Sequence, residues 1–156
     1  MSFAPAWGSL PAASLHNRVL SRSSERGAVE LYLPAPGVSI VRIAGRLETE
    51  LSRDLIEAYE PAFMSAPYLR AFMDCEQMSG YDSAARSLLT EWVIRHRRQV
   101  RGCWVLTGSK LVAMGITVAD TALSVAGVGR IRHVKRPGLI SAIELGLRKA
   151  REGQKA

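Results

Sequence analysis

Three consecutive residues, Tyr81, Asp82 and Ser83, stand between an apolar segment and a segment of helix-forming composition, and Arg86 follows one turn later. The N-terminus of a helix presents unpaired backbone N–H groups and the positive end of the helix dipole, which favour an anion by roughly 0.3–1 kcal/mol. A phosphate on the Ser83 hydroxyl would be stabilised there. Asp82 and Ser83 are also the residue types that cap helices, so a purely structural role is the competing interpretation. Arg86 could pair with Asp82 at the i,i+4 spacing or reach a phosphate on Ser83.

These residues are positioned by the stretch from Phe72 to Leu89. Its pattern predicts the end of a strand, a polar turn over residues 76–80, and a helix that follows Ser83. Because strand-to-helix turns lie at the surface and carry function more often than the elements they join, this turn is the candidate site.

The rest of the chain predicts alternating strands and helices. Strands 29–33 and 38–43 are separated by Pro36-Gly37, which indicates an antiparallel hairpin. A helix is capped by Thr49 or Ser52, is kinked or restarted by Pro61, and ends by Pro67. Further strands are expected at 68–74, 103–106 and 131–134, and further helices at 110–123 and from Pro137 onward.

This order of elements predicts an α/β domain built on a mixed β-sheet. The hairpin supplies the antiparallel pair, and the helical connections favour parallel crossovers between the later strands. We expect four to five strands with the helices mainly on one face, and an edge strand at 131–134 protected by basic residues.

The sequence resembles the STAS family, which includes the anti-sigma-factor antagonists of bacteria. The resemblance lies in Tyr81-Asp82-Ser83 after the strand that ends at Asp74, and in the Gly45-Arg46-Leu47 ending of the second strand. Residues 102–107 resemble the fourth strand of the family, and residues 142–145 its closing helix. The resemblance implies a STAS-like domain over residues 29–150, with Ser83 as phosphoacceptor for a serine kinase that is itself the anti-sigma factor.

The chain departs from the family pattern at two places. Ala84-Ala85-Arg86 follows the serine where family members carry small residues and glycine, and Glu48 follows the second strand without the usual aspartate. Asp82, Arg86 and Tyr81 are therefore expected as partner contacts or as neighbours of the phosphate.

Length and composition indicate one domain of 156 residues, with residues 1–28 as a partly irregular extension and 151–156 as a basic tail. Phe3, Trp7 and Leu10 of the extension are expected to dock on the domain itself rather than on a partner. No secretory signal or membrane span is recognised, so we expect a cytoplasmic protein.

The net charge is +7, and the segment from Arg130 onward holds eight basic and two acidic residues, 8 − 2 = +6. Without a recognition motif or a row of aromatic residues, this charge predicts attraction to acidic partners rather than specific binding of nucleic acid. The two cysteines, Cys75 and Cys103, are expected to be reduced and buried.

Two functions remain open. The first is a non-enzymatic regulatory module that binds an anti-sigma kinase or related ATPase and releases it when Ser83 is phosphorylated. The second is an unphosphorylated STAS-type scaffold or sensor that self-associates or binds a protein through its basic C-terminal face. An enzyme is disfavoured because the three histidines, His16, His96 and His133, lie far apart in the sequence. We expect no metal and no cofactor.

Overall fold

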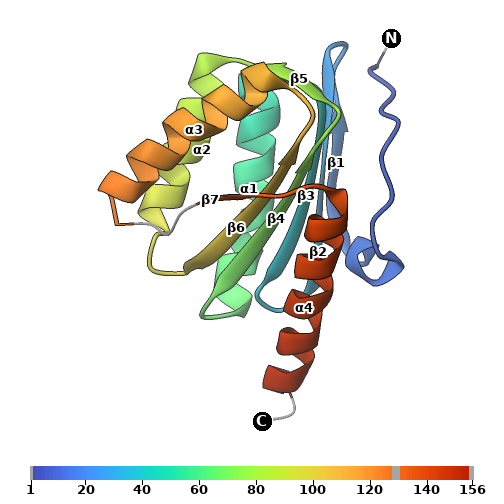
Figure 1. The fold of residues 1–156 in the computed structure, drawn as a ribbon, viewed down its shortest axis with the longest axis vertical. Helices are drawn as coiled ribbons and strands as arrows, with labels where there is room; N and C mark the ends of the chain where they lie inside the picture. The colour runs from blue at the N-terminus through green and yellow to red at the C-terminus, as the bar shows by residue number, and fades with distance from the viewer. Residues whose placement is uncertain (1, 128–130, 155–156) are drawn as a thin grey trace.

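A seven-stranded mixed sheet lies between two layers of helix (Figure 1). The computed structural model describes residues 2–127 and 131–154. The strands are β1 (Arg18–Ser23), β2 (Gly27–Ala35), β3 (Val38–Leu47), β4 (Leu69–Cys75), β5 (Met78–Tyr81), β6 (Val100–Thr107) and β7 (Ile131–His133). The helices are α1 (Thr49–Ser65), α2 (Ser83–Arg95), α3 (Lys110–Val125) and α4 (Arg136–Gln154), and a short 3-10 turn covers Ala12–Leu15.

The strand order is β1-β2-β3-β4-β6-β7, with β5 paired to β3. The predicted hairpin is confirmed: β2 and β3 pair antiparallel, and Gly37 in the turn between them takes a positive φ of 79° that favours glycine. The predicted parallel crossovers are also confirmed, because the pairs β3–β4, β4–β6 and β6–β7 are all parallel. The mixed α/β architecture therefore stands, with more strands than the four to five expected.

Two apolar cores lie on opposite faces of the sheet. Helices α1, α2 and α3 cover the first core, which includes Val41 and Ile43 of β3. Helix α4 covers the second, which includes Ile40 of β3 and Leu139 and Ile143 of the helix. Most helices therefore cover one face, as expected, and β3 is buried on both faces along nearly its whole length.

The N-terminal segment is more ordered than predicted. Residues 18–23, within the segment expected to be a partly irregular extension, form β1 and pair antiparallel with β2, a strand that the sequence analysis did not predict. Before β1, the Trp7 ring lies beside Arg42, with 5.0 Å between the guanidinium carbon and the ring centroid. Leu10 packs against the core that α4 covers. The expectation that this segment docks on its own domain is confirmed. At the other end, α4 continues through Gln154, beyond the predicted start of the tail at residue 151.

Two further predictions need correction. Helix α1 begins at Thr49, but Glu48 is its N-cap, no side chain of the N-cap bonds to the helix, and Pro61 lies inside the continuous helix. The predicted polar turn over 76–80 is shorter than expected, because Met78–Tyr81 form β5 and pair with the last residues of β3. Within β5, Ser79 is exposed whereas Met78 and Gly80 are buried. This alternation is typical of a half-buried strand, but the turn-forming residue types of the segment favoured a turn in the sequence analysis.

A buried charge cluster joins the sheet, α4 and the N-terminal segment. The Asp74 carboxylate is almost fully buried and accepts hydrogen bonds from Arg136 Nη1 and Nη2 at 3.2 and 3.0 Å. Arg42 lies 3.5 Å from the same carboxylate, and it also donates to the Gly8 carbonyl. Arg136 further pairs with Glu76 and donates to the backbone of Ser9.

Asp74→Asn should destabilise the fold by about 3 kcal/mol, because it leaves two arginines without their buried counter-charge. Urea unfolding of the full chain measures this loss. Asp54→Asn is the matched control, since Asp54 forms a long, exposed ion pair with Arg22 at 3.9 Å and its loss should cost about 0.5 kcal/mol or less. Equal losses in the two variants would contradict the assignment.

Candidate functional site

The expected phosphoacceptor lies at the start of a helix. The chain leaves β5 at Tyr81, Asp82 is the N-cap residue of α2, and Ser83 is its first helical residue. Ser83 is exposed, and within the described part of the chain we find no hydrogen bond from its hydroxyl. The prediction that a strand and a helix bring these residues to one exposed turn is therefore confirmed, while phosphorylation itself stays a prediction.

Asp82 is fixed by residues far away in the sequence. Its Oδ1 atom accepts from Arg46 Nε at 2.8 Å and lies 2.7 Å from Arg46 Nη2, and its Oδ2 atom accepts from the Thr49 backbone N–H at 3.3 Å. The hydrogen bond from Arg46 is the main cause that lowers the pKa of Asp82 below its ordinary value. Asp82 thus joins the end of β3 and the first turn of α1 to the start of α2.

This geometry decides between interpretations of the Asp82-Ser83 pair. Asp82 occupies the N-cap position of α2, as the capping interpretation expects, but its side chain makes no hydrogen bond to that helix and bonds instead to the first turn of α1. Of the two uses of Arg86 that the sequence left open, the pair with Asp82 is not the one found, because Arg46 pairs with that carboxylate. Sequence reasoning missed Arg46, because only the pairing of β3 with β5 brings positions 46 and 82 together.

Arg86 and Tyr81 lie on the inner side of the turn. The Arg86 guanidinium is 5.8 Å from the centroid of the Tyr81 ring. The Tyr81 ring packs so closely on Gly115 of α3 that a Cβ there would lie 2.4 Å from the ring. Glycine in the middle of a helix costs about 0.5–1 kcal/mol relative to alanine, and this contact explains why glycine nevertheless occupies position 115 within α3.

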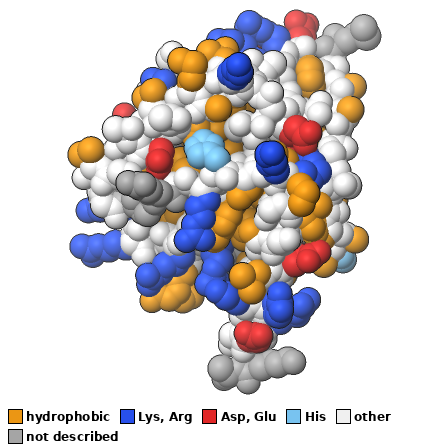
Figure 2. All heavy atoms as spheres, viewed as in Figure 1, with side chains coloured by type: hydrophobic (Ala, Val, Ile, Leu, Met, Phe, Trp, Pro, Cys, Tyr) orange, Lys and Arg blue, Asp and Glu red, His pale blue; other side chains and the backbone are white. Residues whose placement is uncertain are grey.

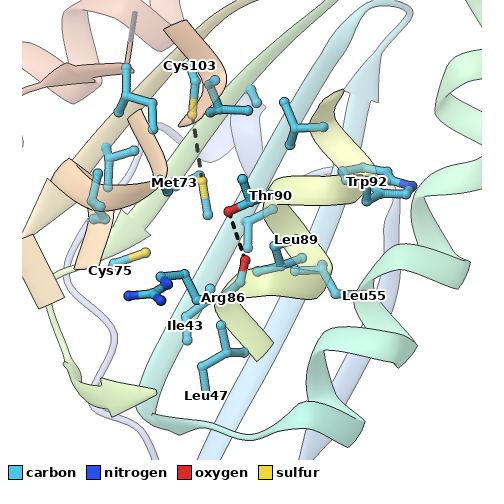
Figure 3. A pocket seen from close by; sticks show the side chains of 18 of the residues that line it. Ile43, Leu47, Leu55, Met73, Cys75, Arg86, Leu89, Thr90, Trp92 and Cys103 are labelled. Carbon is cyan, nitrogen blue, oxygen red and sulfur yellow. Dashed lines mark hydrogen bonds between the residues drawn. The ribbon is translucent and has the colours of Figure 1, made fainter. Parts of the chain in front are cut away.

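An apolar cavity lies between the sheet and helices α2 and α3, next to the turn. Its volume is about 170 Å³, and its lining includes Ile43, Met73, Leu89, Cys103, Val105 and Ala119. Figure 3 shows Arg86 extending from α2 across this space toward Cys75, the last residue of β4. No sequence pattern indicates the cavity, because the same apolar residues would also fill a solid core.

The basic surface differs in part from the expectation. Arg132, Lys135, Arg148, Lys149 and Arg151 are exposed, but Arg136 is turned inward to Asp74 and Glu76. Arg130 and Lys155, which belong to the predicted basic segment, lie outside the described residues. Figure 2 shows basic side chains also gathered at the lower left of the view, where β6 begins.

The cysteines are free, as expected. Burial raises the pKa of the Cys103 thiol to about 12 and also raises that of Cys75, so neither supplies the thiolate of a nucleophilic cysteine at neutral pH. Within residues 2–127 and 131–154, no three potential metal ligands gather at one point. No helix in the same ranges has the length and apolar character needed to cross a membrane.

Comparison with solved structures identifies the fold. The chain superposes on a protein of the DUF3478 family with a SpoIIAA-like fold from Shewanella loihica PV-4, with a TM-score of 0.55 and 13% identity. The match covers 80% of this chain and 95% of that one. The chain has a STAS-like fold of the SpoIIAA type.

A second solved structure with this fold is the anti-sigma factor antagonist SpoIIAA in its unphosphorylated form. Its TM-score is 0.48 at 12% identity, over 74% of this chain and 96% of that one. No protein-family model matches the sequence, and no curated protein matches it either.

Asp82→Asn should lower stability in a pH-dependent way. The pKa of Asp82 is held below 3.8 in the folded state, so its pair with Arg46 contributes fully above that pH and is lost as the pH falls below it. The stability difference between wild type and Asp82→Asn, measured by urea unfolding, should therefore be largest near neutral pH and shrink below about pH 4.

Arg46→Met provides the control for the pair. In its background, the effect of Asp82→Asn should be smaller, because the main partner of the carboxylate is already absent. An effect of equal size in both backgrounds would contradict the pairing.

Proposed function

We propose that the chain is a non-enzymatic regulatory binding module whose contact with a protein partner is switched by phosphorylation of Ser83. The observation that carries this proposal is the exposed Ser83 hydroxyl at the first turn of α2, beside an Asp82 carboxylate that Arg46 holds in place. Because Ser83 does not cap the helix, its hydroxyl is available to a kinase at little cost to the fold. The SpoIIAA-type fold is consistent with this role.

The local chemistry supports a switch that leaves the domain folded. A phosphate adds about −1.5 to −2 charges and three acceptor oxygens, which the backbone N–H groups of the first turn of α2 can bind. Arg46 already compensates the Asp82 charge, so the added charge would not face an unpaired carboxylate. Arg86, one turn further along the same helix, extends into the cavity on the inner side of the turn, so these backbone N–H groups would be the main contacts of the phosphate.

The phosphate would leave the domain folded but would weaken binding of the partner. A surface that fits a neutral serine beside Asp82 would meet two clustered negative groups after phosphorylation, and unfavourable charge contacts in a desolvated interface cost several kcal/mol. The partner class that this mechanism requires is a serine kinase that both binds and modifies the turn, such as an anti-sigma factor or a related ATPase domain. Tyr81 and Arg86 would lie at the edge of that contact.

A second candidate is an unphosphorylated scaffold or sensor that self-associates or binds a protein through its basic C-terminal face. The exposed cations Arg148, Lys149 and Arg151 near the end of α4 favour it. Reversing Arg148 and Arg151 to Glu would abolish such an association and leave a contact at Ser83 unchanged. Sedimentation equilibrium of the wild-type chain and of the doubly substituted chain measures whether the self-association is lost.

Ser83→Asp should weaken partner binding by tenfold or more, about 1.4 kcal/mol, while Ser83→Ala should bind as tightly as the unmodified chain. Both variants should keep their free energy of unfolding within about 0.5 kcal/mol of wild type, because the hydroxyl is exposed and makes no hydrogen bond within residues 2–127 and 131–154. Calorimetric titration with candidate serine kinases of the source organism measures the affinities, and urea unfolding measures the stability.

Ser87 supplies the matched control, because it is an exposed serine one turn further along α2. Ser87→Asp adds the same charge away from the helix N-terminus and should change partner affinity much less. Intact-mass and peptide-mass measurement of protein from its own cells should place a phosphate on Ser83. Equal partner affinity in Ser83→Asp and Ser83→Ala would remove the switch.

A further inference from the structure

The cavity beneath α2 and α3 is large enough to hold a small molecule. Its volume is about 170 Å³, and its lining is almost wholly apolar. An engineered apolar cavity of about 150 Å³ in another protein stays free of water and binds benzene, which sets the scale of an occupant. A cavity of this size and lining has room for one short apolar chain or ring, and it disfavours water because water would lack hydrogen-bond partners there.

One charged side chain enters this apolar space. Arg86 is the single charged residue among the described residues that line the cavity, and Figure 3 shows its guanidinium reaching across it. Within residues 2–127 and 131–154, no carboxylate pairs with this guanidinium; its neighbour is the Tyr81 ring, 5.8 Å away. Arg86 is half-buried, so its guanidinium is partly removed from water, and an anion or hydrogen-bond acceptor in the cavity would replace the hydration that it loses.

Most other polar groups of the lining are engaged or weakly polar. The Thr90 hydroxyl donates to the Arg86 backbone carbonyl at 2.8 Å, and the Cys103 thiol faces the Met73 sulfur at 3.8 Å. The Tyr59 hydroxyl is bonded to Ser39 at 2.9 Å. The Trp92 Nε1–H is buried and has no hydrogen-bond partner among the described residues, but it is neutral. The cavity therefore offers one guanidinium as its charged group, one neutral N–H donor, and apolar surface elsewhere.

We propose that this cavity binds a small monocarboxylic acid with an apolar tail. The carboxylate would pair with the Arg86 guanidinium in the two-bond geometry that arginine forms with carboxylates, and the tail would lie against Met73, Leu89 and Val105. A diacid fits less well, because its second charge would meet only apolar side chains. A phosphate ester fits less well, because the lining offers a single cation. This ligand site does not rest on phosphorylation of Ser83.

Octanoate is the probe, and 1-octanol is its uncharged counterpart of equal chain length. Calorimetric titration of the full-length wild-type chain should show octanoate binding about tenfold or more tightly than 1-octanol, because only the carboxylate gains a charge-assisted pair. Equal affinity for the two probes would overturn the role of Arg86. Absence of octanoate binding at millimolar concentration would overturn the site.

Three variants locate the site. Arg86→Met should weaken octanoate about tenfold or more and leave 1-octanol unchanged, so the octanol titration also reports that the cavity is intact. Arg95→Met is the matched control, because it removes the same charge from an exposed position on the same helix, outside the cavity lining. Ala119→Leu adds bulk to the α3 side of the lining and should weaken both probes.

Each result decides the proposal. Octanoate binding that is unchanged in Arg86→Met, or weakened as strongly in Arg95→Met, would overturn the assigned carboxylate site. Binding of both probes that survives Ala119→Leu would place them outside the cavity. Because these titrations use no kinase and no phosphate, their failure would leave the Ser83 switch standing, and failure of the switch would leave the ligand site standing.

Discussion

The burial of β3 on both faces is the constraint on which the rest of the structure depends. Its alternating side chains enter two different cores, Val41 and Ile43 under α1–α3, and Val38 and Ile40 under α4. A shift of one residue in its pairing would exchange the two sets of side chains and move Arg42 into the larger apolar core. The neighbouring strands, and with them both helical layers, are fixed by the register of this one strand.

Two carboxylates form ion pairs that depend on this register and fix the segments around them. Asp74, near the end of β4, pairs with Arg42 of β3 and Arg136 of α4. Because Arg136 also donates to the backbone carbonyl of Ser9, the cluster holds both α4 and the N-terminal segment against the sheet. Asp82, which follows β5, pairs with Arg46 and accepts a hydrogen bond from the first N–H group of α1, and these two contacts fix the turn that begins α2. Asp74 is the second-last residue of β4, and Asp82 directly follows β5. Both strands are parallel to β3, and each arginine partner from β3 is available only because the register is correct.

Helix α2 contributes one residue to each of the two proposed sites. Its first residue, Ser83, faces solvent, whereas Arg86 one turn later enters the cavity between the helices and the sheet. The Tyr81 ring lies beside Arg86 and against Gly115 of α3. One short segment therefore places the hydroxyl that we propose as the phosphorylation site on its outer side and a cation beside an apolar space on its inner side.

The sequence by itself determined the fold class, the hairpin, the four helices and the placement of Ser83 at a helix start, because these follow from local periodicity and turn chemistry. Tertiary structure alone decided the rest. β1 and β5 are short and half polar, so only pairing with β2 and β3 defines them as strands. Position 82 resembles a cap in sequence, and its bond to Arg46 depends on β3 and β5 lying side by side. The cavity likewise exists only where packing of α2 and α3 leaves space, which no residue pattern records.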